Sequence, residues 1–264
     1  LSWLTNDIDL HAETAVLCRN RDLCPDTVRP LFERQIGFQY IPESYFPACT
    51  VEDGALCLHG HRYTAVLGDK ALFPDAAHPE VSALEPDCRC DPPQPMLRCA
   101  SFNKEGRACW LLVNEGNTPI KTRLTLPVDA PLCRYDLWNG QPCACPAERT
   151  AKGACLPLEL PARGSLLLFT CTARESEALP LPPTYLSLAA PDFALADEDA
   201  AHLTKTYRAT LQITATELQT ATPLLTLRGQ EMAELTVNGQ PAGVSFWSPH
   251  KFPLAGLLTP GENT

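Results

Sequence analysis

The sequence lacks the features that mark nucleic-acid-binding and membrane proteins. No stretch has more than two consecutive Lys or Arg residues, and the formal net charge is −10. Phosphate backbones and anionic membranes recruit basic patches, which are absent here. Wholly apolar runs such as 166–169 are far shorter than the roughly 20 residues of a membrane helix. We therefore expect neither nucleic acid nor a membrane as a partner.

The familiar catalytic and cofactor motifs are also missing. The sequence has no GxSxG, no HExxH, no phosphate-binding glycine loop and no dinucleotide fingerprint. We therefore expect no cofactor. The opening residues LSWLTNDIDLHAET contain no Met, basic n-region or apolar h-region, so no signal peptide is predicted, although an upstream start stays open.

Cysteine is plentiful but unevenly placed. The thirteen cysteines form an odd set without CxxC spacing, which suits a reduced compartment and favours a cytoplasmic location. All of them lie between Cys18 and Cys171. This change in composition predicts a domain boundary near residue 172, followed by a Pro-rich linker.

Proline-rich composition indicates short segments joined by rigid turns. The chain has 26 Pro, 14 Gly and 2 Met among 264 residues, with 45% hydrophobic residues. This favours a mainly β fold with a core, divided into more than one domain. The predicted parts are an abridged α/β domain with a β-hairpin insert (1–75), a β-sandwich (76–172), a linker (173–190) and a second, truncated β-sandwich (191–264).

The first part alternates strand and helix patterns. Residues 14–18 predict a strand, FQYI a second strand and 62–69 a third, apolar on both faces as in parallel sheets. Asp53-Gly54 predicts a hairpin turn between the last two. After Pro25 a helix is predicted to end at Gly37. Its apolar face is expected to comprise Val28, Leu31, Phe32 and Ile36.

Beyond residue 76, short strands separated by turn clusters predict sandwiches. The candidate strands of the first sandwich are CWLLV, TRLTLPV, CRYDLW, LPLEL and SLLLFT. In the last part, TYRATLQI alternates as one half-buried strand, with Tyr207, Ala209, Leu211 and Ile213 facing one way. Asn238-Gly239 predicts a tight hairpin.

Residues 233–264 carry a family resemblance. They resemble the galactose-binding-like jelly roll of the β-galactosidase and β-glucuronidase family and of bacterial α-L-rhamnosidase-like enzymes. Residues 97–169 resemble the all-β module of such enzymes, and 1–75 resembles a remnant of their flavodoxin-like domain. The matching positions of the jelly roll are Asn238-Gly239, Gly243, Phe252-Pro253 in altered order, Leu257 and Gly261-Glu262-Asn263.

The resemblance implies part of a bacterial glycoside hydrolase. A catalytic (β/α)₈ barrel takes about 250 residues, and no eightfold strand-helix alternation is found. We therefore expect a non-catalytic accessory part that supports or docks carbohydrate beside a catalytic barrel domain upstream. Two alternatives stay open: a stand-alone carbohydrate-binding or assembly module, and catalysis by this chain itself.

Each of three motifs can be interpreted either as a functional site or as a structural feature. Asn114-Glu115 matches an acid/base dipeptide of the β-galactosidase clan, but its turn-forming neighbours favour a turn. His59-Gly60-His61 favours a hairpin tip over a metal site. The pairs Cys88/Cys90 and Cys143/Cys145 favour buried or unpaired thiols over a zinc site. No metal is expected.

Sugar binding without cleavage needs an exposed aromatic plane beside polar groups. The loop VSFWSPHKF offers these, although its aromatic residues equally suit the closed end of a sandwich. Trp138, on a predicted turn, has the same two interpretations. The candidate carbohydrate-binding residues are Phe246, Trp247, Ser248, His250 and Trp138.

The jelly rolls of the resembled family continue from Gly-Glu-Asn into a further apolar strand. No such strand follows Gly261-Glu262-Asn263 in the sequence up to Thr264, which predicts an open sheet edge beside residues 233–238. We expect residues beyond Thr264, or self-association with another chain, to cover this edge.

Overall fold

A computed structural model describes residues 6–264 except 20–22, 137–139, 230 and 247. The fold is mainly β, as predicted. The chain forms two compact units, Leu1–Tyr135 with Pro142–Pro180 and Asp136–Gln141 with Leu181–Thr264. Across the described ranges, no helix is long and apolar enough to cross a membrane.

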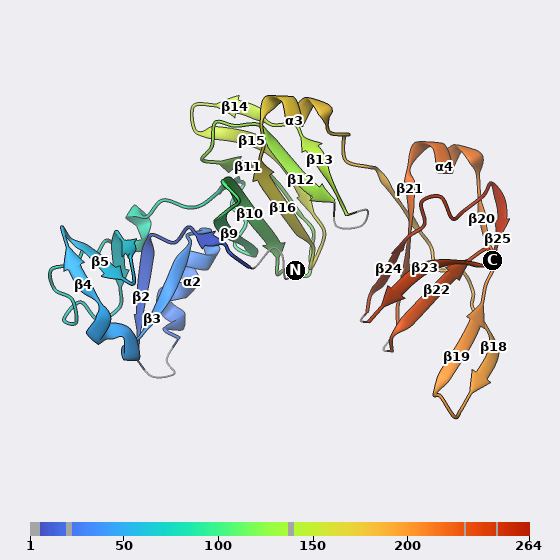
Figure 1. The fold of residues 1–264 in the computed structure, drawn as a ribbon, viewed down its shortest axis with the longest axis horizontal. Coiled ribbons are helices and arrows are strands. Elements are labelled where there is room, and N and C mark those ends of the chain that lie inside the picture. The colour runs from blue at the N-terminus through green and yellow to red at the C-terminus, as the bar shows by residue number, and fades with distance from the viewer. Residues whose placement is uncertain (1–5, 20–22, 137–139, 230, 247) are drawn as a thin grey trace. The chain divides into compact units, whose positions relative to one another are not determined.

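The first unit begins with a small parallel sheet (Figure 1). Its central strand β2 (Thr14–Cys18) pairs in parallel with β3 (Phe38–Pro42) and β7 (Ala65–Leu67). All five residues of β2 are buried, which confirms the predicted strand. The helix α2 (Pro25–Glu33) connects β2 to β3, as a parallel pair requires.

The end of α2 differs from the prediction. Gln35, with φ of 55°, supplies the left-handed conformation expected of Gly37. The amide nitrogen of buried Gln35 lies within hydrogen-bonding distance of four carbonyl oxygens, which share its two hydrogens: those of Phe32, Glu33, Gln94 and Leu97. These bonds tie the helix end to the strand that follows residue 96, so a polar residue replaces glycine here.

Two details of the predicted helix and third strand are corrected. Phe32 is 40% exposed, because its ring packs on the edge of Phe38 and not into the core. The predicted strand 62–69 divides at Thr64 between the hairpin insert and the parallel sheet. The insert consists of β4 (Thr50–Glu52), β5 (Ala55–Leu58) and β6 (His61–Tyr63).

Both hairpin turns of the insert use positive φ angles. Asp53 and Gly54 have φ of 48° and 77°, and His59 and Gly60 have φ of 49° and 83°. This is the geometry of the tight turns that twist with their strands. The predicted Asp53-Gly54 hairpin and the hairpin-tip interpretation of His59-Gly60 are therefore confirmed.

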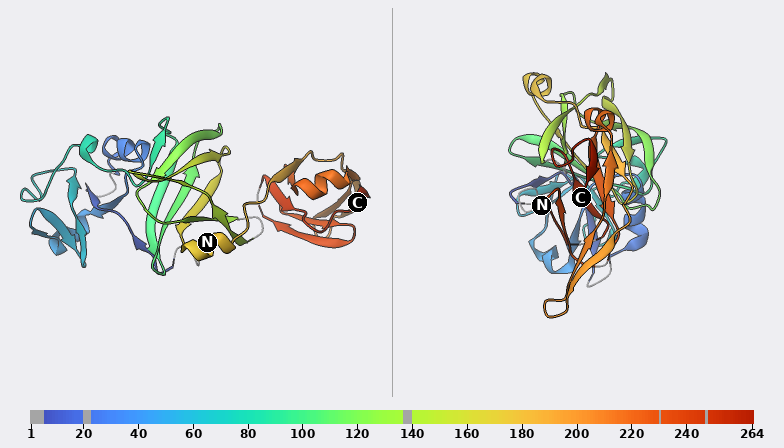
Figure 2. Two further views of the ribbon diagram at one scale, coloured as in Figure 1. Left: turned by 90° about the horizontal axis from the view of Figure 1, so that it is seen from above. Right: turned by 90° about the vertical axis from the view of Figure 1, so that its right-hand side faces the viewer.

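The rest of the first unit is a β-sandwich of two antiparallel sheets (Figures 1 and 2). One sheet has the order β1-β9-β10-β16-β12-β13 and the other β14-β15-β11-β8. The strands of the six-stranded sheet are β1 (Asp9–Leu10), β9 (Leu97–Lys104), β10 (Arg107–Asn114), β16 (Ser165–Thr170), β12 (Leu132–Asp136) and β13 (Gln141–Cys145). The strands of the four-stranded sheet are β14 (Glu148–Thr150), β15 (Gly153–Leu160), β11 (Ile120–Leu126) and β8 (Arg89–Asp91). All five predicted strands of this sandwich are confirmed within a few residues, although the last two residues of CRYDLW lie outside the described part of the chain.

The sandwich core lies between the two sheets. Trp110, Leu112 and Leu168 of the six-stranded sheet pack with Leu124 and Leu156 of the four-stranded sheet. The outer face of the six-stranded sheet is also apolar, with a second cluster around Phe102, Cys109 and Leu167. An antiparallel sheet that faced water there would be polar on that side. The helix α3 (Ala173–Ala178) follows β16, and the predicted linker 173–190 thus contains α3 and the strand β17 (Tyr185–Leu188).

The second unit has its own small core. Its central sheet pairs β17 in parallel with β21 (Thr222–Leu227), which pairs antiparallel with β24 (His250–Pro253). Ile213, Leu225, Val237, Phe252 and Leu254 are buried in this core. The remaining elements are β18 (Ala194–Asp199), β19 (Thr204–Arg208), β20 (Leu211–Ile213), α4 (Ala215–Thr220), β22 (Ala233–Val237), β23 (Gln240–Ser245) and β25 (Gly261–Asn263).

The predicted half-buried strand TYRATLQI is wrong in its first half. Residues 209 and 210 separate β19 from β20. Every residue of β18 and β19 is exposed, and Tyr207 is 52% exposed, because this hairpin projects from the unit as a two-stranded ribbon (Figure 1). Leu211 and Ile213 do contact the core.

The Asn238-Gly239 hairpin is confirmed, with φ of 52° and 77° between β22 and β23. The Asn238 amide donates to the carbonyl of Leu257, at 3.0 Å, and to Oδ1 of Asn263, at 2.8 Å. The two most distinctive parts of the resembled motif, Asn-Gly and Gly-Glu-Asn, therefore hold each other in place. Among the described strands β22 pairs with β23 alone, so its other side has no strand partner there.

Candidate functional site

The residues predicted to bind sugar are in different environments. Phe246 is 63% exposed, and Ser248 is also exposed. His250 is 2% exposed, and its Nδ1 lies 3.0 Å from the Ser245 hydroxyl oxygen. Trp247 and Trp138 lie outside the described residues. A sugar site at this loop therefore stays a prediction that includes Phe246 and Ser248, whereas a ligand at the surface would not reach His250.

The Asn114-Glu115 dipeptide lies at the end of β10, directly before a bend at residues 116–118. The fully buried Asn114 amide donates to the carbonyls of Thr118, at 2.8 Å, and Pro161, at 3.0 Å, and accepts the Gly116 N–H. Glu115 forms an ion pair with Arg98, at 2.8 Å. These contacts give both side chains structural roles.

The predicted metal candidates also make structural contacts. His61 Nε2 lies 2.9 Å from the carbonyl oxygen of Ala12, and the His59 ring packs on Tyr45. The thirteen cysteines, all in the described part of the chain, form no disulfide. Cys88 lies against Cys90 and Cys99, and hydrogen bonding with Cys88, together with burial, raises the pKa of Cys90. No group of three or more His, Cys, Asp or Glu within the described ranges is placed to hold a metal ion.

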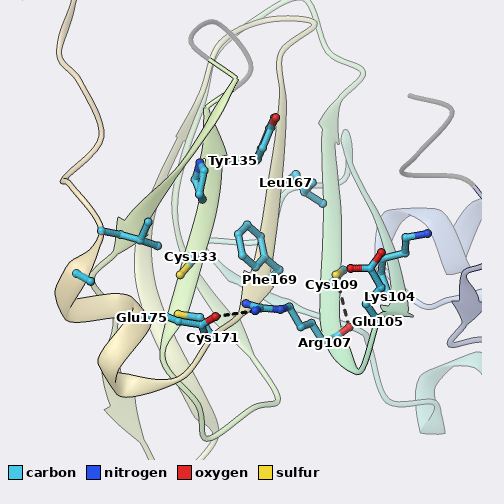
Figure 3. A pocket seen from close by; sticks show the side chains of 13 residues that line it. Lys104, Glu105, Arg107, Cys109, Cys133, Tyr135, Leu167, Phe169, Cys171 and Glu175 are labelled. Carbon is cyan, nitrogen blue, oxygen red and sulfur yellow. Dashed lines mark hydrogen bonds and ion pairs between the residues drawn. The ribbon is translucent and has the colours of Figure 1, made fainter.

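A pocket of about 440 Å³, here called the sheet pocket, opens on the outer face of the six-stranded sheet (Figure 3). Its floor is formed by side chains that alternate outward along β10, β16 and β12, and α3 lies at one side. The floor residues are Cys109, Leu167, Phe169, Cys133 and Tyr135. The sequence carries a signal for this site, because LLLF in β16 is apolar on both faces of the strand. A strand with one face in water would alternate apolar and polar residues.

Charged side chains stand at the rim of the sheet pocket. Arg107 donates to Glu175 at 2.7 Å, and its guanidinium lies 5.9 Å from the centre of the Phe169 ring (Figure 3). Glu175 also accepts from the Thr172 N–H as part of a capping box at the start of α3. The Thr172 N–H and the Arg107 guanidinium hold the pKa of Glu175 at about 2. Glu175 is thus a fixed negative charge that cannot act as a general acid near neutral pH.

Two of the thiols in the sheet pocket, those of Cys133 and Cys109, have raised pKa values. Burial, with Cys171 beside it, raises the pKa of Cys133 to about 12. Burial also raises the pKa of Cys109. Because the thiolate is the nucleophile and metal ligand, these protonated thiols serve as small apolar side chains at neutral pH. The sheet pocket can therefore accept an apolar group, and neither of these two thiols is activated as a nucleophile.

Comparison with known proteins shows a shared fold but assigns the chain to no sequence family. No protein-family model matches the chain, and no curated protein matches it. A rhamnosidase from Novosphingobium sp. PP1Y matches 96% of this chain with a TM-score of 0.55 at 10% identity. The match covers 34% of the rhamnosidase, so the chain spans about a third of the length of that protein. The chain therefore shares its fold with about a third of this rhamnosidase.

Two further solved structures match smaller parts. A β-L-arabinopyranosidase from Geobacillus stearothermophilus matches 33% of this chain and 20% of its own, with a TM-score of 0.25 at 17% identity. The α-galactosidase I of Mortierella vinacea matches 35% of this chain and 25% of its own, with a TM-score of 0.24 at 21% identity. Scores this low add nothing to the assignment of the fold.

Proposed function

We propose that this chain is a non-catalytic accessory part of a glycoside hydrolase, which supports or docks carbohydrate beside a catalytic barrel. The observation that carries the proposal is the match along 96% of the chain to about a third of a rhamnosidase. A match of this extent includes the α/β part, the sandwich and the second unit, one after another along the chain. That order is more specific than any one of these common folds.

The apolar outer face of the six-stranded sheet supports the docking role. The sheet pocket combines an apolar floor with one ion pair at its rim, which resembles the anatomy of interfaces within proteins. We propose that the catalytic domain of the same enzyme inserts apolar side chains there. The structural roles of Asn114 and Glu115 support a non-catalytic function.

An assay of the purified chain on a panel of nitrophenyl glycosides, including the α-L-rhamnoside, tests the proposal. We expect no turnover by the wild-type chain and no difference in the Glu115→Gln variant. Turnover that persists after repurification and is lost in Glu115→Gln would show that the chain is itself an enzyme. The reading frame upstream supplies a second test, because a stand-alone module would have no barrel encoded there.

A further inference from the structure

The strand β22 forms an open edge in the second unit. It pairs with β23 on one side (Figure 1), and no described strand pairs with it on the other. Ala233 and Leu235 contact the core but are only half-buried, and Glu234 and Thr236 are exposed. An edge of this kind presents main-chain N–H and C=O groups to which another strand can bind.

The hairpin geometry shows which residues of β22 direct their main chain to the open side. Val237 and Gln240 flank the two-residue loop, so they bond to each other and the main chain of Val237 faces β23. The extra residue of the bulge is Ala242 in β23, so β22 keeps its regular alternation. The N–H and C=O groups of Thr236 and Glu234 therefore face away from β23.

Pro241 and Asn238 support this assignment. Pro241 lies opposite Thr236 and has no N–H, which suits a position that is not bonded to β22. The N–H of Asn238, two residues after Thr236, donates to the carbonyl of Thr264 at 2.6 Å and not to β23. Thr264 therefore covers one end of the open edge, and no described strand covers residues 234 and 236.

We propose that a second copy of this chain binds the open edge, with the β22 strands of the two copies antiparallel about a two-fold axis. In the register that places Leu235 opposite Leu235 of the second copy, Thr236 lies opposite Glu234 of the second copy. The main chains of these two residues then donate and accept hydrogen bonds reciprocally.

Charge and hydrogen bonding select this register. An axis through Glu234 would place the two Glu234 carboxylates opposite each other, and like charges there are destabilising. An axis through Thr236 would require the N–H of Asn238, which already donates to Thr264. With the axis at Leu235, the only charged side chain of β22 meets a neutral hydroxyl. Because β22 is complementary to itself in this way, a second copy is favoured over an unrelated strand.

The same register brings apolar side chains together. Ala233, Leu235 and Val237 all contact the core of the unit, and Ala233 would lie opposite Val237 of the second copy. The two Leu235 side chains would meet at a position without main-chain bonds, where opposite side chains are closest. A five-residue strand buries less than the roughly 1,200 Å² of a stable interface, so we expect a reversible dimer. The dimer does not depend on the accessory function proposed above.

Sedimentation velocity of the purified chain from about 1 to about 500 µM tests the proposal. We expect a monomer–dimer equilibrium in wild type. Thr236→Glu places like charges opposite each other at both symmetric positions, so it should weaken dimerisation about tenfold. Adding Glu234→Lys places opposite charges there and should restore the dimer. The matched control Thr216→Glu, at an exposed position of α4, should dimerise like wild type.

A cysteine at position 235 reports the register. Leu235→Cys would place two thiols opposite each other across the axis, at a spacing that suits a disulfide. All native cysteines precede residue 172, so a linked pair of peptides that contain position 235 is identified unambiguously by mass spectrometry. With oxidised glutathione present, Leu235→Cys should link the two copies. The matched control Thr236→Cys, which faces Glu234 of the second copy, should link them far less.

Three outcomes would overturn the proposal: a wild-type chain that is monomeric at every concentration, dimerisation that is equal in wild type and Thr236→Glu, or links that form as readily through Thr236→Cys as through Leu235→Cys. Urea unfolding of each variant checks that the second unit is folded. Should Thr236→Glu alone be unfolded, Thr236→Arg, which attracts Glu234 of the second copy, should strengthen dimerisation, and no change would count against the proposal. The nitrophenyl glycoside assay is unaffected by these outcomes, so the accessory function is tested separately.

Discussion

The charge of Asp87 should destabilise the first unit at neutral pH. Its pKa is raised from 3.8 to about 6, mainly by burial. At about 1.4 kcal/mol for each tenfold change in acidity, the difference between a pKa of 3.8 and one of about 6 corresponds to about 3 kcal/mol between the two protonation states. Because the folded state holds the proton more tightly, this penalty is fully present above pH 6. It fades as the pH falls from 6 towards 3.8.

The Asp87→Asn variant is therefore expected to be more stable than wild type at pH 8. Asn removes the buried charge but leaves a buried amide, which costs about 1 to 3 kcal/mol when its hydrogen bonds are incomplete. The net gain should be about 1 kcal/mol at pH 8, and the advantage over wild type should vanish near pH 4. A residue that lowers stability in this way is typical of a binding or catalytic site.

Urea unfolding at pH 4, 6 and 8, followed by hydrogen exchange of peptides from β9 and β10, measures this difference in the first unit. Asp75→Asn, which removes the same charge from an exposed position, is the control, and its stability should follow wild type at every pH. An Asp87→Asn variant that is less stable than wild type at pH 8 would refute the reasoning, because it would mean that the carboxylate has strong partners.

Three further substitutions test the packing of the fold. Asn263→Ala removes an amide that is 2% exposed and bonds to Thr259 and Asn238, so the free energy of unfolding of the second unit should fall by about 2 to 3 kcal/mol in urea. The control Gln219→Ala, at an exposed position, should change it little. Gly153→Ala would place a Cβ atom 2.0 Å from the carbonyl oxygen of Leu126 at a φ of 116°, so urea unfolding should find no folded first unit. The control Gly106→Ala has open space around the new Cβ atom at a φ of 77°, so it should lower the free energy of unfolding by only about 1 kcal/mol. Thr172→Ala should cost about 1 kcal/mol and increase hydrogen exchange in α3, because it removes the capping hydroxyl.

Much of the fold was accessible from sequence because its signals are local. A tight hairpin requires positive φ at two adjacent residues, and Asp53-Gly54 and Asn238-Gly239 both adopt it. The sandwich strands follow from apolar alternation between turns. The prediction failed where tertiary contacts decide, as at Gln35, whose amide bonds across 62 residues to Leu97 and so ends α2 without glycine. It also failed in β19, where alternation is present but nothing covers either face.

The pockets were much harder to predict than the strands. A pocket of about 280 Å³ beside β9 combines His11, Gly37, Asp87 and Ser101, which are spread over 90 residues and carry no motif. Even the glycine was given another role, as a helix cap, because its closeness to a distant carboxylate has no local signature. The sheet pocket left a trace in the apolar outer positions of β16, but its charged rim depends on where α3 lies.

The motif that carries the family resemblance has a structural role, and this limits what it can say about ligands. Asn238 and Asn263 bond to each other, and their remaining amide atoms bond to main-chain groups between Leu257 and Thr264. Side chains used in this way have little capacity left for sugar hydroxyls. The motif can therefore persist in any chain with this turn arrangement, whatever the ligand.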